Sequence, residues 1–249
     1  NGVWHVYGRD MKDSHWRSGG YGTISLGKAM ELSSNIGVSY MVDHFYHNNP
    51  ERFVKGIWRT GINDPNISIP IEGHARPSIR MPERYPNGQW KNWSKTALLW
   101  MSIGYETQIP PIYTLTFYNA IANNGRMMQP RFVKATVKNG DTLTAYPPQV
   151  VKGREQIASE KTIKIMQDLL HRVVINGTGK KANSPNFWVC GKTGTAMIAK
   201  NGSYKGAPNH LLSFAGWFGE KDKPYYSCIV CIQKQGLPAY GWMSGQVFK

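Results

Sequence analysis

The last third of the chain contains three runs of residues with strong strand character, and this feature constrains the fold more than any other. The runs cover residues 187–197, 211–219 and 225–235, and the turn-rich segments NGSYKGAPNH and EKDKP separate them. Consecutive strands joined by short loops are typical of an antiparallel meander. Helical patterns lie earlier in the chain, and this order of helices first and sheet last predicts the α+β class.

The part of the chain before the strands is expected to be mainly helical, over about residues 23–180, with the meander over about residues 185–235. Thr23 is a candidate cap for a first helix, because threonine is a favoured cap residue. Residues 33–35, Ser-Ser-Asn, interrupt this helix, and residues 36–46 resume the helical pattern. Together, residues 1–249 are expected to form a single domain.

Two longer helices are predicted from apolar residues at helical spacing, around residues 111–124 and 160–174. Their expected buried faces are Ile112, Leu115, Tyr118 and Ala122 in the first helix and Ile165, Met166, Leu169, Leu170 and Val173 in the second. Residues 56–95 are rich in proline, glycine, asparagine and tryptophan, which predicts a loop-dominated excursion.

The chain is strongly basic, with 30 lysine and arginine residues against 15 acidic residues and a net charge of +15. Such a surface favours polyanions, anionic lipid headgroups or acidic substrates. The basic residues are scattered, however, and the sequence contains no basic helix or zinc-finger spacing. We therefore expect a solvated basic surface and no nucleic-acid partner. A non-enzymatic basic binding module, with salt-sensitive affinity for DNA or anionic lipid, is an alternative interpretation.

The cysteines and histidines do not predict a metal or redox site. Cys228 and Cys231 have redox-motif spacing, but positions three apart on a strand point to opposite faces, so buried structural thiols are expected. His44 and His47 could share a helix face, but no third ligand lies nearby in the sequence. We expect no metal site and no cofactor.

The motif most suggestive of chemistry is Lys192-Thr193-Gly194-Thr195, which lies within the first predicted strand. Glycine weakens a strand, and its usual reason there is a bulge or the close approach of a backbone or ligand. One lysine and two hydroxyl groups on such a strand suit a carboxylate. An ordinary strand with a bulge is the alternative. The Lys-Thr-Gly triplet is a modest signal alone, and Ser-x-Asn is weaker because it occurs at residues 33–35 and again at 184–186.

The arrangement of these motifs resembles the penicillin-binding proteins and serine β-lactamases, whose signature set is Ser-x-x-Lys, Ser-x-Asn and Lys-Thr-Gly. The resemblance covers SGGYGTISLGKAMELSSNIGVSYM, MSIGYETQIPPIYTLTFYNAIANNGRMMQPRFV, GTGKKANSPNFWVCGKTGTA and LLSFAGWFGEKDKPYYSCIVCIQK. It is greatest with the class B penicillin-binding proteins, specifically the division-type transpeptidase of Bacteroidetes-like bacteria. It implies a penicillin-binding protein/β-lactamase-like fold whose antiparallel sheet packs against helices.

The resemblance also implies a reaction, namely acyl transfer at the D-Ala-D-Ala end of a peptidoglycan stem peptide through a seryl ester. Ser33 would relay a proton to the leaving amine, and Asn35 would hold the catalytic lysine and a substrate amide. Lys192 would support Ser33 and attract the terminal carboxylate, which the Thr193 and Thr195 hydroxyls would bind. The Thr195 N–H would serve in the oxyanion hole. Gly194 would let the substrate approach as an added strand.

One departure from the family pattern concerns the nucleophile. The family places Ser-x-x-Lys well upstream of Ser-x-Asn, whereas the only match here is Ser25-Leu26-Gly27-Lys28, a few residues before Ser33. We interpret this match as a coincidence. The nucleophilic serine, its lysine base, the first strands of the sheet and the central helix are then expected to be absent from this chain, which would be an inactive piece of a longer protein.

The resemblance implies further partners and a location. The longer protein would bind stem peptides and β-lactam antibiotics, and would work with a membrane glycosyltransferase and divisome proteins. It would lie at the periplasmic face of the inner membrane, anchored by an N-terminal helix outside this chain. A β-lactam hydrolase or sensor shares the motifs and remains an alternative, although no glutamate is clearly placed as a deacylating base.

Overall fold

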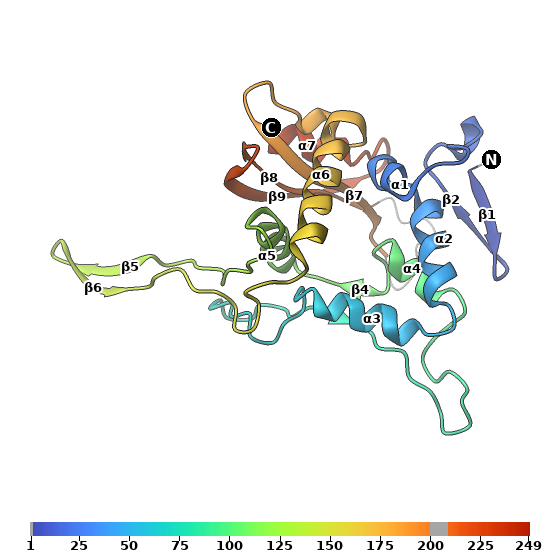
Figure 1. Ribbon diagram of the computed structural model, residues 1–249, viewed down its shortest axis with the longest axis horizontal. Coiled ribbons are helices and arrows are strands. Elements are labelled where there is room, and N and C mark those ends of the chain that lie inside the picture. Colours follow the sequence, from blue (N-terminus) through green and yellow to red (C-terminus); the bar gives the residue numbers. More distant parts are fainter. Residues whose placement is uncertain (1, 200–208) are drawn as a thin grey trace.

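A three-stranded antiparallel sheet forms the C-terminal part of the molecule (Figure 1). The structure is a computed structural model that describes residues 2–199 and 209–249. Strands β7 (Trp188–Met197), β8 (Asn209–Glu220) and β9 (Lys223–Gln235) follow one another in the sheet as they do in the chain. The predicted meander and the α+β class are therefore confirmed. Of the first predicted turn, residues 201–208 lie outside the described residues.

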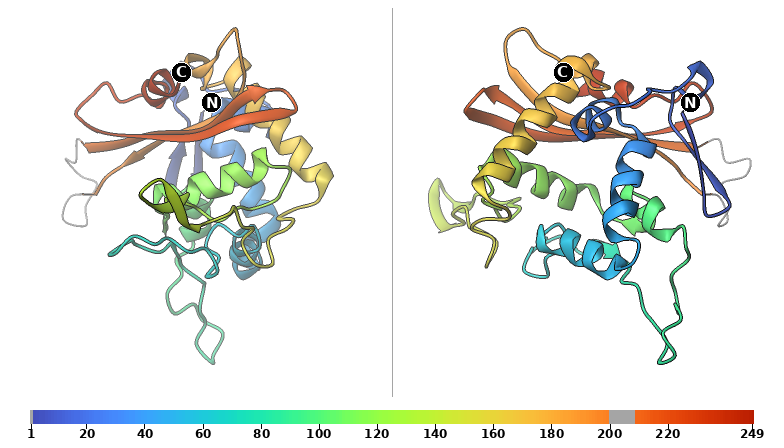
Figure 2. Two further views of the ribbon diagram at one scale, coloured as in Figure 1. Left: turned by 90° about the vertical axis from the view of Figure 1, so that its left-hand side faces the viewer. Right: turned by 45° about the vertical axis from the view of Figure 1, so that its right-hand side comes forward.

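Helices cover both faces of this sheet. Helix α5 (Pro111–Ala122) lies against one face and α7 (Trp242–Phe248) against the other, whereas α6 (Glu160–Asn176) crosses the sheet beside β7, as Figure 2 shows. Leu170 of α6 therefore packs with residues of α5, and Val174 of the same helix packs with Phe248 of α7. The alternation of side chains along the strands explains this division. On β7, Cys190 packs with residues of α5 and α6, whereas its neighbour Val189 packs with Phe248 of α7. The sequence analysis did not predict α7.

Three helices lie before and after residues 33–35, where the sequence predicts a break between helices. These are α1 (Leu26–Leu32), α2 (Asn35–Tyr46) and α3 (Pro50–Arg59). The predicted cap Thr23 is wrong, because Ser25 caps α1 and its Oγ accepts a hydrogen bond from the Lys28 N–H at 3.2 Å. The break at residues 33–35 is confirmed, and Ser34 caps α2.

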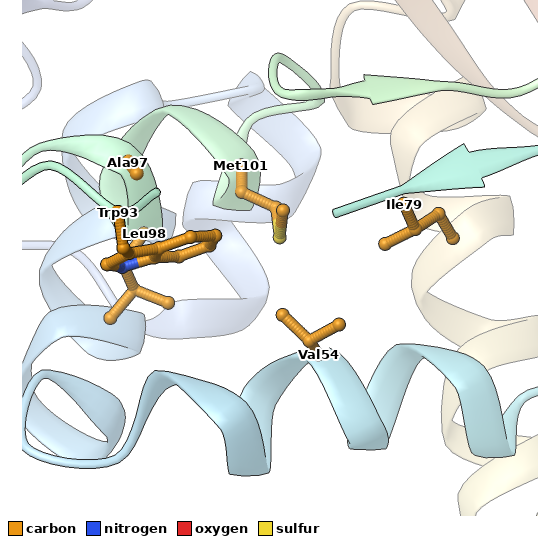
Figure 3. Close-up of a cluster of buried hydrophobic side chains, with 6 residues drawn as sticks. All are labelled: Val54, Ile79, Trp93, Ala97, Leu98 and Met101. Carbon is orange, nitrogen blue, oxygen red and sulfur yellow. The ribbon is translucent and has the colours of Figure 1, made fainter. Parts of the chain in front are cut away.

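The excursion contains more regular structure than the sequence analysis predicted. Helix α3 occupies its first residues, and strand β3 (Ser78–Ile79) pairs with β4 (Thr107–Gln108). The excursion then leads into α4 (Ala97–Ser102). These elements enclose a core of their own, shown in Figure 3, that consists of Val54, Ile79, Trp93, Ala97, Leu98 and Met101. Burial of these apolar side chains holds a proline-rich segment in one conformation.

Two hairpins complete the described chain, with two short 3-10 turns, Trp16–Ser18 and Lys180–Ala182. Strands β1 (Val3–Val6) and β2 (Arg9–Lys12) form the first hairpin beside α2. Strands β5 (Ala135–Lys138) and β6 (Asp141–Ala145) form the second, which projects away from the body in Figure 1.

Two details of burial differ from the predictions. Ile165 on α6 is 50% exposed, because the helix turns Ile163, Leu170 and Val174 toward the core instead. Cys231 is also exposed and Cys228 is only half-buried, because β9 is the outermost strand of the described sheet. The expectation of buried thiols is therefore wrong for Cys231 and only partly met by Cys228, whereas Cys190 on β7 is buried.

Candidate active site

The junction between α1 and α2 presents Ser33 at a sharp reversal of the chain. Ser33 ends α1 in the left-handed conformation, with φ 55° and ψ 43°. A serine adopts this region only when its surroundings require it, because the Cβ atom crowds the backbone. The next residue, Ser34, caps α2 by accepting a hydrogen bond from the Gly37 N–H at 2.9 Å. The reversal therefore leaves the Ser33 side chain exposed at the turn.

The structure brings Ser33 together with Lys192, although 159 positions separate them in the chain. Lys192 Nζ donates a hydrogen bond to Ser33 Oγ at 2.7 Å and another to the Thr193 carbonyl at 3.1 Å. Burial lowers the pKa of Lys192 from 10.5 to about 8, because removal from water disfavours the charged form. This lysine is therefore mostly protonated at neutral pH but close to its titration range.

Asn35 lies in the same turn, at the first residue of α2. Its side-chain Nδ2 donates a hydrogen bond to the Lys12 carbonyl at 3.0 Å. This bond ties the amide group to the end of the β1–β2 hairpin. Asn35 is only half-buried, so its position beside Ser33 keeps it at the surface of the site.

Thr193 and Thr195 lie on the face of β7 opposite to that of Lys192, as the alternation of a strand requires. Thr193 is buried, and its hydroxyl is 2.7 Å from the hydroxyl of Thr178. Thr195 is exposed. Gly241, just before α7, lies so close that a Cβ atom there would be 2.9 Å from Thr195 Oγ1.

Gly194 faces Ser213, its partner on β8. A Cβ atom at Gly194 would come too close only to the Ser213 hydroxyl, which could rotate away. The strand pairs with β8 along one edge, and among the described residues no strand pairs with its other edge. An unpaired strand edge is the kind of surface to which an extended peptide adds through backbone hydrogen bonds. Gly241 lies beside this edge, where a Cβ atom would be 3.3 Å from the Gly194 carbonyl oxygen.

The match Ser25-x-x-Lys28 does not form a serine–lysine pair of the catalytic kind. The Ser25 hydroxyl caps the helix, and Lys28 Nζ bonds Glu31 Oε2 at 2.9 Å. Glu31 also forms an ion pair with Arg172 of α6. Burial alone raises the pKa of Glu31, but the hydrogen bond from Lys28 and the charge of Arg172 outweigh it and hold the pKa below its ordinary value.

Thr178 and Glu31 are site residues that the sequence analysis missed. The Thr178 N–H donates to the Glu31 carbonyl at 3.1 Å, and the Thr178 hydroxyl meets that of Thr193. Thr178 thus connects the end of α1 to the strand that carries Lys192. Residues 177–179 form a turn, and the residue types of a turn do not reveal which side chains it brings into contact.

A cavity of about 610 Å³ lies away from this pair of residues. Its lining includes Trp188, Cys190 and Trp217 but neither Ser33 nor Lys192. Within residues 2–199 and 209–249, no three His, Cys, Asp or Glu side chains gather in a way that could hold a metal ion. In the same ranges, no helix combines the length and apolar character that a membrane span needs.

A terminal antiparallel sheet, a lysine on its first strand and a Ser-x-Asn turn between two helices define a penicillin-recognising class of serine proteins. The family model of the penicillin-binding protein transpeptidase domain matches residues 1–249, and the chain belongs to this family. The family predicted from the sequence is confirmed, whereas the Bacteroidetes-like origin and the absent Ser-x-x-Lys segment stay predictions.

Individual relatives agree with this assignment. The chain is 32% identical to stage V sporulation protein D of Bacillus subtilis over 87% of its own length and 31% of that protein. It is 25% identical to the peptidoglycan D,D-transpeptidase MrdA of Acinetobacter baumannii over 79% of its length and 29% of that protein. The chain therefore spans only about a third of the length of these curated relatives.

Solved structures show the same fold. The D,D-transpeptidase domain of a peptidoglycan glycosyltransferase from Eggerthella lenta matches with a TM-score of 0.73 and 24% identity, over 98% of this chain and 56% of that one. The transpeptidase domain of penicillin-binding protein 3 from Burkholderia pseudomallei matches with a TM-score of 0.73 and 24% identity, over 100% of this chain and 67% of that one.

Proposed function

We propose that this chain forms one wall of the active site of a peptidoglycan D,D-transpeptidase, which transfers an acyl group from D-Ala-D-Ala stem peptides through a seryl ester. The observation that carries the proposal is the 2.7 Å hydrogen bond between Lys192 Nζ and Ser33 Oγ. It joins the Ser-x-Asn turn to the Lys-Thr-Gly strand across the boundary between helices and sheet. The name of the relative from Acinetobacter baumannii supports the same reaction.

In this proposal Ser33 relays a proton to the leaving amine. Lys192 stabilises the Ser33 oxygen as the proton moves, since the buried ammonium already donates to it. Asn35 holds the catalytic lysine and a backbone amide of the substrate. The bond from Asn35 Nδ2 to the Lys12 carbonyl fixes the plane of its amide group, so its oxygen has a defined direction.

The substrate lies along the free edge of β7 as an added strand. The Thr193 and Thr195 hydroxyls bind its terminal carboxylate, with Lys192 providing the nearby positive charge. Gly194 leaves the edge clear of a side chain. The Thr195 N–H is one donor of the oxyanion hole, and such donors are worth about 3 kcal/mol in related chemistry.

The setting of the reaction follows from the same proposal. The longer protein that contains this chain acts in the periplasm at the inner membrane, where it is anchored by an N-terminal helix. It works with a membrane glycosyltransferase and with division proteins, and β-lactam antibiotics acylate its nucleophilic serine. One solved neighbour at 22% identity is a penicillin-binding protein 3 in complex with ampicillin, which shows a likeness of fold.

Covalent labelling by a fluorescent penicillin tests the proposal. The longer protein should be labelled, and Lys192→Ala should slow labelling strongly because it removes the donor to Ser33. The 249-residue chain alone should stay unlabelled. Labelling of the chain that disappears in Ser25→Ala would show that Ser25 is the nucleophile and that its interpretation as a coincidence is wrong.

Two other outcomes would favour the alternative functions. Rapid turnover of a chromogenic cephalosporin by the longer protein indicates a β-lactam hydrolase. Tight binding of DNA that weakens steeply with salt, without any penicillin labelling, indicates a basic binding module.

A further inference from the structure

The turn that carries Ser33 is held by a residue that belongs to none of the three motifs. Asp13 directly follows β2 and is 4% exposed. Its Oδ2 accepts a hydrogen bond from Ser34 Oγ at 2.8 Å, and its Oδ1 accepts one from the Ile36 N–H at 3.1 Å. One buried carboxylate thus binds both a side chain and a backbone group of the turn.

The position of this carboxylate suits its charge. It lies at the N-terminus of α2, a helix of 12 residues, where the exposed N–H groups and the helix dipole favour a negative group. Hydrogen bonds to a carboxylate are also stronger than those between neutral groups. The backbone of Asp13 is itself fixed, because its N–H donates to the Gly2 carbonyl at 3.1 Å and its carbonyl accepts from the Trp16 N–H at 3.1 Å.

Ser33 needs such support because of its conformation. Its φ of 55° lies in the left-handed region, which non-glycine residues leave unless the surrounding structure imposes it. After Ser33, the Asp13 carboxylate binds Ser34 and Ile36, and the Lys12 carbonyl binds Asn35. The residues at the end of the β1–β2 hairpin therefore bind all three residues that follow Ser33.

We infer that Asp13 is a positioning residue of the acyl-transfer site, whose buried carboxylate keeps the α1–α2 turn in the shape that places Ser33 Oγ within hydrogen-bond reach of Lys192 Nζ. Asp13 acts through Ser34 and Ile36 and does not itself touch the Ser33–Lys192 pair. The catalytic importance of this placement rests on the proposed function, whereas the placement itself belongs to this chain.

The first test uses the chain itself and nuclear magnetic resonance. Asp13→Ala should shift the side-chain signals of Lys192 and speed amide exchange at Ile36 and Gly37, while the protein stays folded. Asp13→Asn keeps one acceptor oxygen and should give smaller changes in the same signals. Asp10→Ala is the matched control, because Asp10 is an exposed carboxylate on the same hairpin and should leave Lys192 unaffected.

If Asp13→Ala does not fold, two milder variants test the same inference. Asp13→Asn and Ser34→Ala each remove part of the network and should then show the Lys192 shift in a graded way. Unchanged Lys192 signals in folded variants of Asp13 would overturn the inference, because the turn would then hold Ser33 without the carboxylate.

The second test measures acylation of the longer protein by a fluorescent penicillin. Asp13→Ala should lower the acylation rate constant by about a hundredfold, as misplaced catalytic groups do, with little change in the preceding non-covalent binding constant. The acylation rate constant of Asp13→Asn should lie between those of Asp13→Ala and the unaltered protein. Asp10→Ala should have the rate constant of the unaltered protein. A wild-type rate in Asp13→Ala contradicts the inference. If the unaltered protein is not acylated at all, the proposed function fails, and the Lys192 signals still decide whether Asp13 positions Ser33.

Discussion

At the scale of single residues, Lys192 has the most unusual environment of the site. Its ammonium group is buried against β7 and bonds Ser33 Oγ, and its pKa is lowered to about 8. The charged form is thus less favourable in the folded chain than in the unfolded chain. A lysine of this kind stabilises a neighbouring oxygen while remaining sensitive to mild alkali.

The lowered pKa of Lys192 predicts a pH dependence of stability. Between about pH 8 and pH 10.5 the unfolded chain binds more protons at this residue than the folded chain, so its contribution to the free energy of unfolding rises with pH. Lys192→Gln should remove this contribution. Urea unfolding of both proteins across this pH range measures the contribution of Lys192. The cysteines titrate in the same range in both proteins, so their effect cancels when the two free energies of unfolding are subtracted. A difference that does not vary with pH would contradict the buried lysine.

Thr178 gives a second prediction at this scale. Thr178→Val removes the partner of the buried Thr193 hydroxyl and should destabilise the chain by about 1 kcal/mol. In the longer protein it should also weaken non-covalent binding of a penicillin carboxylate, since Thr193 loses its fixed rotamer. Thermal unfolding and a binding titration measure the two effects. Thr178→Ser keeps the hydroxyl and is the control that should behave like the unaltered protein.

At the scale of secondary-structure elements, α1 is anchored to α6 through a buried acid. Glu31 is 1% exposed and pairs with Lys28 of its own helix and Arg172 of α6. The α1–α2 turn follows directly, so this contact fixes the turn from the side opposite to the β1–β2 hairpin. The two contacts together explain how a short helix of seven residues can place the Ser-x-Asn turn.

Removal of this acid should be costly. Glu31→Ala removes a buried carboxylate from Lys28 and Arg172, whose side chains are 41% and 39% exposed, and should lower the free energy of unfolding at pH 7 by about 2 kcal/mol. The deficit should shrink at acid pH, because a carboxyl with a lowered pKa loses its stabilising contribution as pH falls through that pKa. Asp168→Ala removes an exposed partner of Arg172 and should cost less than about 1 kcal/mol. Equal costs for the two variants would show that burial is not decisive.

The elements that sequence reasoning predicted are those with local signals. Helices α5 and α6 and the three-stranded meander follow from apolar periodicity and from turn residues between adjacent strands. Helix α7 has no such signal, since it is short, contains a glycine and forms because Phe248 packs on Phe214 at 4.6 Å between ring centroids. Helix α3 begins at Pro50 with Asn49 as its cap, and the sequence analysis did not predict this helix.

The site was predictable only in part. Lys192 was singled out from the glycine-containing strand that carries it, whereas Ser33 and its pairing with Lys192 came from family resemblance, because no local pattern links residues this far apart in sequence. Asp13, Glu31 and Thr178 were missed because each acts through a tertiary contact with a partner more than ten residues away or on another element. The face of Thr193 and Thr195 follows from strand alternation, but the contact of Gly241 with Thr195 depends on where α7 folds back.

At the scale of the whole molecule, the described sheet ends at strand β9, which pairs with β8 along only one of its two edges. Strand β9 has 13 residues, pairs only with β8 among the described strands, and exposes Tyr225 and Tyr226. Long edge strands readily pair with other chains. The net charge of +15 opposes such pairing through mutual repulsion between molecules.

This balance predicts salt-dependent association of the isolated chain. Added salt screens the repulsion over about 10 Å at 0.1 M ionic strength, so sedimentation should show larger assemblies as salt rises. Tyr226→Lys places a charge on the edge strand and should reduce association. Tyr85→Lys, at an exposed tyrosine outside the sheet, is the control that should leave association unchanged. A fully monomeric chain at high salt would show that the edge is covered.

The projecting β5–β6 hairpin provides a site for inserting other sequences. Every side chain of β6 is exposed, and the hairpin begins and ends where the Tyr146 N–H bonds the Lys134 carbonyl at 2.9 Å. Because these two residues already touch, the eleven residues between them can be exchanged for a short turn or for a peptide tag without stretching the backbone. A tagged chain with an unchanged melting temperature would then serve as a bait for partner proteins, with the Ser33–Lys192 pair left undisturbed.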